Sequence, residues 1–390
     1  MALKVLVVDQ ARGVWGAQRY LLRLAPLLRK QDIELTLACP AELGLYDAWG
    51  ATGLTAHDVR LPILRSIRND GQPQLGDIAR ESYRGVRAAG QIAKLALKIR
   101  ADAIWANAHW MHVESVLAGR LTHKPVAIHL HEEAVPGLGQ RIRTTAVRWA
   151  NRTVSVSEAV ADGVPGNVRE RIEVIVNGVD TDEMSPAHTD STAALRAELG
   201  VAADEVMVLA ATRLDPSKRI EDLIETLRIA SEPRIHLVIA GETSGFPEYA
   251  RAVQECARST RVGRITFCGL RADMPQLFRA ADVVLHASVV EGMPLGLIEA
   301  QSCGTPVVAY RVAGVPEAVV DGVTGMLVAP QDTAGLAAAL TTLTADPALR
   351  ARMGSAGRDH VLAHHRIEDQ ARRNGDLLYD MCRVPKRSSG

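Results

Sequence analysis

The chain has 390 residues, which is long for one hydrophobic core and predicts two domains of ordinary size. A hydrophobic fraction of 47% and a formal net charge of zero are typical of a globular protein. Aromatic residues make up only 4% and do not alternate with basic ones, which argues against a stacking platform for nucleic acid.

The apolar runs and the cysteines indicate the cellular compartment of the protein. No apolar run approaches the roughly 18 residues of a membrane span, and the chain begins with a short strand rather than a secretory signal. The five cysteines are odd in number and include no Cys-x-x-Cys pair, which favours neither a disulfide framework nor a zinc site. We therefore expect a cytoplasmic protein.

Short apolar runs alternate with helical patterns along the chain. The sequence predicts an early helix at 17–29 and a polar linker at 181–192. The predicted strands are 3–8, 33–38, 104–106, 126–130, 153–156, 172–176, 206–211, 235–240, 265–268, 283–286 and 307–309. Each run is apolar on both faces, as in parallel strands buried between helices. The sequence predicts an α/β fold with two Rossmann-like domains, whose ligands bind at the carboxyl ends of strands.

The loop after the first predicted strand contains Gly13 and Gly16 just before a helix. A glycine there would let a phosphate approach the backbone at the helix N-terminus. An ordinary tight connection between strand and helix is the alternative.

Basic residues are concentrated in the first part of the chain. Residues 1–150 carry 20 Lys and Arg against 13 Asp and Glu, and the remainder carries 25 against 32. The densest stretch, between Arg60 and Arg100, includes these residues on a predicted helix: Arg65, Arg68, Arg80, Arg84, Arg87, Lys94 and Lys98. We interpret it as a solvated helix face or as a surface attracted to an anionic membrane or acceptor.

The most informative motif runs from Glu291 through Gly-Met-Pro-Leu-Gly-Leu-Ile to Glu299. Pro294 can open a helix whose first N–H groups favour an anion such as a diphosphate. Glu299 then lies roughly 7–8 Å along that helix, at about 1.5 Å per residue, while Glu291 precedes it. Because a diphosphate would repel both carboxylates, we expect hydroxyl partners for them. Two solvated glutamates on an amphipathic helix are the alternative.

This motif, followed by Cys303-Gly-Thr-Pro-Val-Val308, resembles the signature of the family 4 retaining glycosyltransferases. Arg213-Leu214 with Lys218 is similar to the family's Arg-Leu-x-x-x-Lys element, and Asn177-Gly-Val-Asp180 to its interdomain loop. Trp15-Gly-Ala-Gln-Arg19 resembles Gly-Gly-Ala-Glu-Arg, with departures at Trp15 and Gln18. The resemblance is most specific from residue 172 to residue 330.

The resemblance implies a GT-B architecture. An acceptor-binding domain at 1–180, onto which 365–390 crosses back, would face a nucleotide-sugar domain at 181–364 across a cleft. The implied reaction is metal-independent transfer, with retention, from a UDP- or GDP-linked sugar to a hydroxyl. The acceptor would be a glycan, a lipid-linked molecule or a small natural product.

The family motifs also imply roles for single residues. Arg213 and Lys218 would hold the departing diphosphate, and Glu299 would bind the ribose. Glu291 would face the transferred sugar. The donor site is completed by Gly16, Met293, Pro294, Leu295, Gly296 and Arg271. Arg271 lies at the loop whose backbone groups would contact the base, and a surface arginine is the alternative.

Two further positions in the first domain and the linker bear on the site. His131 matches the histidine that ends the corresponding family strand, where it can bond a sugar hydroxyl. We expect His129 to point to the opposite face, so that only His131 reaches the site. Asp180-Thr-Asp182 fits the Asp-x-Asp metal pattern but lies in the interdomain loop, so we predict no metal and no cofactor besides the donor.

Two other classes of function remain as alternatives on the same fold. One is a nucleotide-sugar epimerase or a nucleotide-dependent oxidoreductase, although no Gly-x-Gly-x-x-Gly follows Val8. The other is a non-catalytic sugar-nucleotide-binding protein, against which the intact Arg213, Lys218, Glu291 and Glu299 argue. The donor base, the sugar and the acceptor are not determined by these motifs.

Overall fold

The computed structural model describes residues 2–62, 75–133, 137–186, 192–243, 245–260 and 263–382. The chain divides into two compact units: the first is Met1–Asn177 with Ile367–Gly390, and the second is Gly178–Arg366. Arg65, Arg68 and residues 187–191 of the predicted linker lie outside the described residues. Among the described helices, none is both long and apolar enough to span a membrane.

The first unit is built on a seven-stranded sheet of order β3-β2-β1-β4-β5-β6-β7 in which every pair is parallel. Its strands are β1 (Leu3–Val8), β2 (Ile33–Cys39), β3 (Ala56–Asp58), β4 (Ala103–Ala106), β5 (Val126–Leu130), β6 (Arg152–Ser155) and β7 (Ile172–Val174). Every residue of β4 and β5 is buried, as expected for strands covered on both faces.

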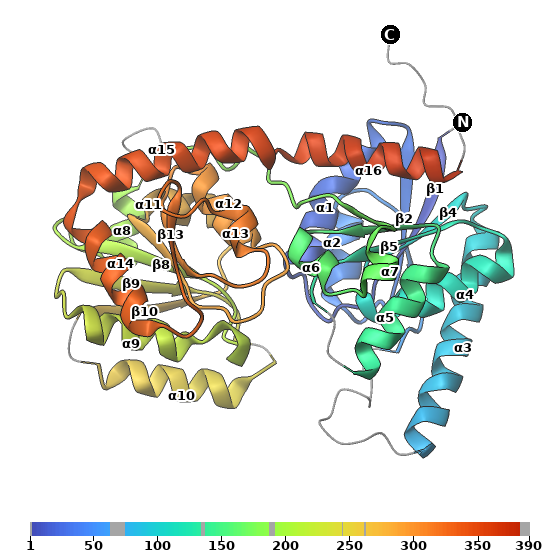
Figure 1. The fold of residues 1–390 in the computed structure, drawn as a ribbon, viewed down its shortest axis with the longest axis horizontal. Helices are drawn as coiled ribbons and strands as arrows, with labels where there is room; N and C mark the ends of the chain where they lie inside the picture. The colour runs from blue at the N-terminus through green and yellow to red at the C-terminus, as the bar shows by residue number, and fades with distance from the viewer. Residues whose placement is uncertain are drawn as a thin grey trace, which may run out of the picture. The chain divides into compact units, whose positions relative to one another are not determined.

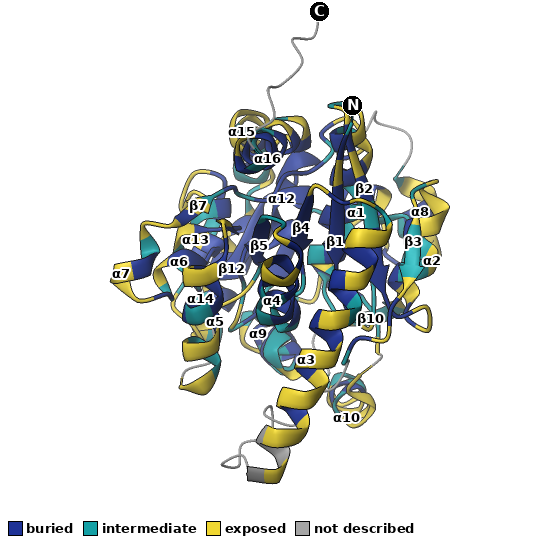
Figure 2. Cartoon of the chain, turned by 90° about the vertical axis from the view of Figure 1, so that its right-hand side faces the viewer, coloured by how far each residue is buried: buried dark blue, intermediate teal, exposed yellow. Residues whose placement is uncertain are grey.

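Helices surround this sheet (Figure 1). They are α1 (Gly16–Arg29), α2 (Gly44–Ala51), α3 (Leu75–Lys98), the 3-10 turn η2 (His109–Met111), α4 (His112–Thr122), α5 (Leu138–Trp149), α6 (Glu158–Asp162), α7 (Gly166–Arg169) and α16 (Ile367–Cys382). The last helix packs against α1, and Tyr379 Oη donates to Gln31 O at 2.7 Å. Figure 2 shows the buried strands and the largely exposed outer side of α3.

The second unit contains a six-stranded parallel sheet of order β10-β9-β8-β11-β12-β13. Its strands are β8 (Val206–Ala211), β9 (Ile235–Ala240), β10 (Arg264–Gly269), β11 (Val283–His286), β12 (Val307–Tyr310) and β13 (Gly325–Val328). Its helices are α8 (Ala193–Glu198), η3 (Pro216–Lys218), α9 (Ile220–Ala230), α10 (Pro247–Arg258), α11 (Met274–Ala280), α12 (Leu295–Ser302), α13 (Val315–Ala318), α14 (Thr333–Ala345) and α15 (Pro347–His364).

The predicted α/β fold with parallel Rossmann-like sheets is confirmed. Two strands were not predicted, β3 and β13, and each lies at the edge of its sheet. Both are short. β3 is Ala-His-Asp, which is not apolar on both faces, and β13 is a run of only four residues that is not buried at every position. The first helix also begins at Gly16, one residue earlier than predicted.

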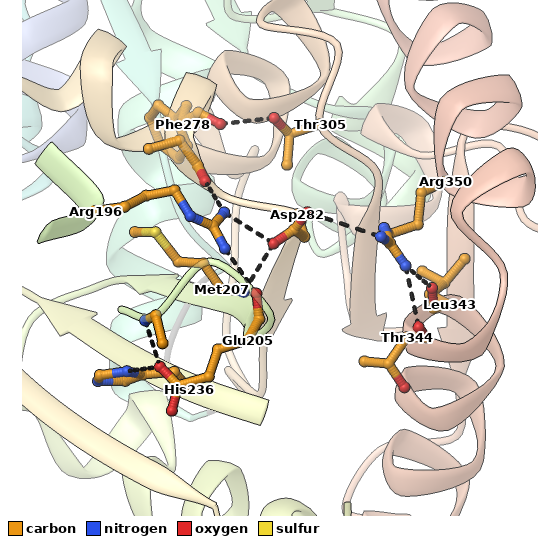
Figure 3. A network of polar contacts seen from close by, with 12 residues as sticks. Arg196, Glu205, Met207, His236, Phe278, Asp282, Thr305, Leu343, Thr344 and Arg350 are labelled. Carbon is orange, nitrogen blue, oxygen red and sulfur yellow. Dashed lines mark hydrogen bonds and ion pairs between the residues drawn. The ribbon is translucent and has the colours of Figure 1, made fainter. Parts of the chain in front are cut away.

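A polar network ties together the N-terminal ends of the second sheet's strands (Figure 3). Asp282, directly before β11, accepts bonds from Arg196 Nη1 at 3.0 Å and from the Met207 backbone N–H at 2.8 Å. His236 is fully buried and pairs through Nδ1 with Glu205 Oε2 at 3.1 Å. Because ligands bind at the carboxyl ends of such strands, we interpret this network as structural.

Candidate functional site

A three-residue cluster lies at the carboxyl ends of β8 and β11. Lys218 is the last residue of η3, and Glu291 lies in the loop between β11 and α12. Lys218 Nζ is 2.5 Å from Glu291 Oε1, and His286 Nε2, from the end of β11, is 3.0 Å from the same oxygen. Both partners therefore converge on one carboxylate oxygen.

This cluster keeps Glu291 ionised. A carboxylate oxygen only accepts, so His286 must donate its Nε2–H. Burial alone would raise the pKa of Glu291, but the charge of Lys218 and the hydrogen bond from His286 hold that pKa well below its ordinary value. The site therefore presents a paired carboxylate and ammonium near neutral pH.

The sequence interpretation gave Lys218 and Glu291 separate partners, a phosphate and a sugar, whereas the structure joins the two in an ion pair. His286 was not predicted at all. Its only signal in the sequence is its place as the last residue of a buried strand, five residues before Glu291.

The loop after β8 holds the two predicted cations in a defined shape. Asp215 Oδ1 accepts from the backbone N–H of Ser217 at 2.9 Å, which caps η3, and Arg213 Nη2 lies 3.4 Å from Asp215 Oδ2. Gly241, after β9, packs so closely that a Cβ there would lie 1.8 Å from Thr212 O. Because only glycine permits this approach, the end of β9 helps to fix the path of the loop after β8.

The helix of the Glu-x7-Glu motif, α12, begins at Leu295, with Pro294 as its N-cap. The predicted start at Pro294 is therefore one residue early. The N–H groups of Leu297 and Ile298 donate to Pro294 O, so the earlier N–H groups of Leu295 and Gly296 precede the helix's own bonding. A Cβ on Gly296 would lie 3.6 Å from Ala211 O, which places this helix start beside the end of β8.

The remaining donor residues of the motif are buried. Met293 lies in the turn before α12, and Glu299 lies in the second turn of that helix with 4% of its surface exposed. A buried carboxylate is costly unless it is bonded, so the alternative of a solvated Glu299 is wrong. Its assignment to a ribose hydroxyl stays a prediction.

The side chain of Arg271 is held by two carboxylates of the second unit. Its guanidinium pairs with Asp273 at 2.6 Å and with Glu198 at 2.7 Å. The hydrogen bonds that Arg271 donates to these two carboxylates raise its pKa above the ordinary value. The predicted contact between its loop and a base would therefore be made by backbone groups.

Asp180, in the predicted Asp-x-Asp motif, caps a turn of the backbone. Its Oδ1 accepts from the N–H groups of Asp182 and Glu183 at 3.0 and 2.9 Å. Within the described ranges, no group of three or more His, Cys, Asp or Glu residues is arranged to hold a metal ion.

The predicted residues of the first unit lie at the carboxyl edge of its sheet. Gly16 is the first residue of α1, and His131 directly follows β5. Burial lowers the pKa of His131 to about 3, so the ring is neutral near pH 7. Gln18, one of the departures from the family pattern, is buried and donates to Asp9 Oδ2 at 3.0 Å.

The expectation that His129 and His131 point to opposite faces is wrong. Their ring centroids are only 4.1 Å apart. Successive residues of a strand alternate in direction, so residues two apart share a face. His129 is fully buried beneath His131 and also contacts the rings of Trp105 and Tyr20.

The buried histidines predict that the protein loses stability in acid. Burial lowers the pKa of His112 and of His129 well below the ordinary value, and that of His131 to about 3. In the unfolded chain the pKa of each of these histidines is about 6.5. The unfolded state therefore binds more protons below about pH 6.5, and the stabilisation present above that pH is lost as the pH falls toward about 3.

We therefore expect the melting temperature to fall steadily between pH 7.5 and pH 5. Thermal unfolding in a series of buffers of equal ionic strength measures this. His112→Gln should flatten the curve, because it removes one group that must be charged on unfolding. A melting temperature that stays constant over this range would contradict the prediction.

Two family models match the chain. Residues 191–360 match the model described as glycosyl transferases group 1, and residues 14–183 match glycosyltransferase family 4. The D-inositol 3-phosphate glycosyltransferase of Saccharomonospora viridis is 33% identical over 279 residues, 69% of this chain and 61% of that protein. The alpha-maltose-1-phosphate synthase of Mycobacterium tuberculosis is 34% identical over 264 residues, 62% of this chain and 66% of that protein. The chain thus spans less than two thirds of either relative.

Solved structures share the fold. Anabaena Alr3699/HepE in complex with UDP and glucose has a TM-score of 0.82 at 24% identity, and the match covers 97% of this chain and 100% of that one. Sucrose-phosphate synthase from Thermosynechococcus elongatus has a TM-score of 0.77 at 21% identity, with coverage of 97% and 99%.

Proposed function

The chain belongs to glycosyltransferase family 4, and from this membership we propose that it transfers a sugar from a nucleoside diphosphate to an acceptor hydroxyl. The observation that supports this best is the arrangement in the second unit. The loop with Arg213 and Lys218 and the start of α12 lie at one edge of the sheet, joined by the Lys218–Glu291 pair. Cations and helix N–H groups together suit a diphosphate.

In the proposed reaction the acceptor attacks on the face from which the diphosphate departs, with retention of configuration. The leaving phosphate accepts the proton of the acceptor hydroxyl. Arg213, Lys218 and the amides of Leu295 and Gly296 stabilise the charge that grows on the diphosphate. Within the described residues, the side-chain contacts of Glu291 both fall on Oε1, so Oε2 is the oxygen that would accept a sugar hydroxyl.

The donor class can be tested by thermal stabilisation. Alr3699/HepE was solved with UDP-glucose, so UDP is the first nucleotide to compare, followed by GDP and ADP. A ligand at one hundred times its dissociation constant stabilises the folded state by about 2.7 kcal/mol, which should raise the melting temperature of a chain of 390 residues by about 3 °C. Release of the nucleoside diphosphate from the matching sugar nucleotide then tests transfer.

The outcomes separate the candidate functions. Stabilisation with acceptor-dependent release of nucleoside diphosphate supports a glycosyltransferase. An epimerase would convert the sugar while it stays attached to the nucleotide, and a binding protein would be stabilised without turnover. If no nucleotide raises the melting temperature and none is released, the proposed function is wrong.

We propose that transfer needs no divalent ion, because Arg213, Lys218 and the N–H groups at the start of α12 would supply positive charge to the predicted diphosphate. Activity should survive excess EDTA in an assay of nucleoside diphosphate release. The idea fails if EDTA removes more than about nine-tenths of the activity, a barrier change of about 1.4 kcal/mol, and only a divalent ion restores it. Asp180 and Asp182 would then become candidate ligands of that ion.

Helix α3 supports a further part of the proposal, peripheral contact with an anionic membrane where a lipid-linked acceptor would lie. Basic residues recur along one exposed stripe at spacings of three, four and seven: Arg80, Arg84, Arg87, Lys94 and Lys98. Beside it lie three exposed apolar side chains, Tyr83 at 67%, Val86 at 66% and Leu97 at 57%. Apolar and basic stripes side by side are typical of helices that lie on anionic lipid.

We expect the protein to sediment with vesicles of phosphatidylglycerol but not with vesicles of phosphatidylcholine, and less so at high salt. Arg87→Glu with Lys94→Glu should reduce binding, at about 1 kcal/mol for each basic residue lost and more on charge reversal. Lys30→Glu, an exposed residue after α1, is the matched control. Equal binding of both vesicle types, or no effect of the double variant, would remove this part of the proposal.

A further inference from the structure

A single residue separates the 3-10 turn that ends at Lys218 from helix α9. That residue, Arg219, has φ 50° and ψ 52°, which is the left-handed region of backbone conformation. A residue with a Cβ rarely adopts this conformation, because the Cβ then crowds the following carbonyl oxygen, whereas glycine adopts it without that steric cost. The chain therefore holds an arginine in a conformation that favours glycine, directly beside a residue of the candidate site.

The left-handed residue keeps η3 separate from α9. If Arg219 were right-handed, the two could continue as one helix, in which the Glu221 N–H would bond to Ser217 O. In the structure, Ser217 O accepts from the Val289 backbone N–H at 3.0 Å. Val289 lies two residues before Glu291, in the loop between β11 and α12. The break thus leaves a carbonyl group of η3 available to join the loop after β8 to the loop that carries Glu291.

A bidentate ion pair holds the side chain of Arg219. Its Nη2 donates to Asp222 Oδ1 at 2.8 Å and its Nε to Asp222 Oδ2 at 3.2 Å, while its Nη1 lies 3.0 Å from Glu221 Oε1. Both carboxylates belong to the first turn of α9. A guanidinium that donates two bonds to one carboxylate is fixed in orientation as well as in position. Since these contacts are made from the left-handed backbone, they stabilise that backbone.

Asp222 is itself held by the sheet of the second unit. It is 6% exposed, and Tyr310 Oη, at the end of β12, donates to its Oδ2 at 2.9 Å. Burial raises the pKa of Tyr310 to about 12, so the phenol keeps its proton near pH 7 and can donate. Thr333 Oγ1, from the first residue of α14, lies 3.4 Å from the same phenol oxygen. The carboxylate that pairs with Arg219 is therefore fixed by elements outside α9.

We propose that Arg219 and Asp222 are positioning residues for Lys218. Their ion pair keeps Arg219 left-handed, and the left-handed residue ends η3 where the Lys218 side chain can reach Glu291. This effect on the backbone does not depend on what the protein catalyses. Its effect on turnover rests on the proposed function, in which Lys218 stabilises the departing diphosphate.

The variants Arg219→Ala and Arg219→Gly test this proposal, because both remove the guanidinium but only glycine adopts the left-handed conformation readily. Arg219→Ala should lower kcat for nucleoside diphosphate release by about 5- to 30-fold, the range that follows from the steric cost of that conformation. Arg219→Gly should keep kcat within about twofold of the wild type. Arg228→Ala is the matched control, because Arg228 also lies on α9 and pairs with Glu225 at 2.7 Å, but with side chains 59% and 45% exposed.

Hydrogen–deuterium exchange followed by mass spectrometry reads the backbone without requiring turnover. The Val289 amide donates to Ser217 O, so a peptide that contains Val289 should exchange slowly in the wild type. We expect faster exchange of this peptide in Arg219→Ala and wild-type exchange in Arg219→Gly. Melting temperatures of both variants show that the rest of the protein stays folded.

Asp222→Asn tests the other member of the ion pair and keeps the shape of the side chain. It weakens the contact with Arg219 but leaves the pair with Glu221, so it should lower kcat less than Arg219→Ala does. Adding Arg219→Gly to Asp222→Asn should restore kcat, because a glycine no longer needs the ion pair. A double variant that stays as slow as Asp222→Asn would show that Asp222 does not act through Arg219.

Four other outcomes would contradict the proposals. Equal losses of kcat in the alanine and glycine variants would show that the guanidinium acts directly, and unchanged exchange in Arg219→Ala would show that the ion pair does not hold the backbone. Faster exchange with normal kcat would overturn the link to turnover through Lys218. A wild-type protein that releases no nucleoside diphosphate would instead overturn the proposed function, and the exchange experiment would still decide whether Arg219 holds the backbone.

Discussion

Lys218→Ala should lower kcat by about 30- to 900-fold, which corresponds to about 2–4 kcal/mol of lost transition-state stabilisation. Charge on the diphosphate grows as the bond to the sugar breaks, so a cation held beside it contributes more in the transition state than in the ground state. Steady-state kinetics at saturating donor, followed by nucleoside diphosphate release, measures the effect. Arg213→Ala should fall in the same range.

The structure adds a consequence to this substitution. Without Lys218, the buried carboxylate of Glu291 keeps only His286 as a recorded side-chain partner among the described residues, so its pKa should rise toward the ordinary range. Lys218→Ala combined with Glu291→Gln should therefore lose less stability than the two single losses added together. Lys30→Ala, at an exposed lysine, is the control for kcat. Near-normal turnover in a folded Lys218→Ala would move the leaving-group site elsewhere.

Glu299→Ala should act mainly on donor binding, raising the donor KM by about 10- to 150-fold with little change in kcat. Hydrogen bonds to a charged group are worth about 1.5–3 kcal/mol, and a ribose contact changes little between ground and transition state. The dissociation constant of the free nucleoside diphosphate should rise by a similar factor, because the ribose belongs to the nucleotide.

Because Glu299 is buried, a second variant is needed to distinguish a loss of donor binding from a loss of folding. Glu299→Gln keeps the shape and one acceptor oxygen, so it should fold like the wild type and show an intermediate KM. Melting temperatures of both variants identify any loss of structure. A 100-fold fall in kcat with KM unchanged would show that the ribose assignment is wrong.

The fold and the outline of the second unit's site could be predicted from the sequence. Runs apolar on both faces predicted the central parallel strands, because such strands are covered by helices on both sides. Spacing along one segment placed Glu299 in the second turn of the helix after Pro294, since a helix repeats every 3.6 residues whatever its surroundings. These features depend on residues close in the chain.

The contacts that define the chemistry were decided by tertiary structure. Lys218 contacts Glu291, which lies 73 residues further along the chain, and Asn107 contacts Asp9 across 98 residues. Arg271 donates to Glu198, which the sequence did not predict. Each pairing depends on which strands are neighbours in the sheet and on the path of the loops that follow them. Patterns among residues close in the chain do not show which strands are neighbours in the sheet. The ion pair on Glu291 and the hydrogen bond between Asn107 and Asp9 therefore follow only from the folded arrangement.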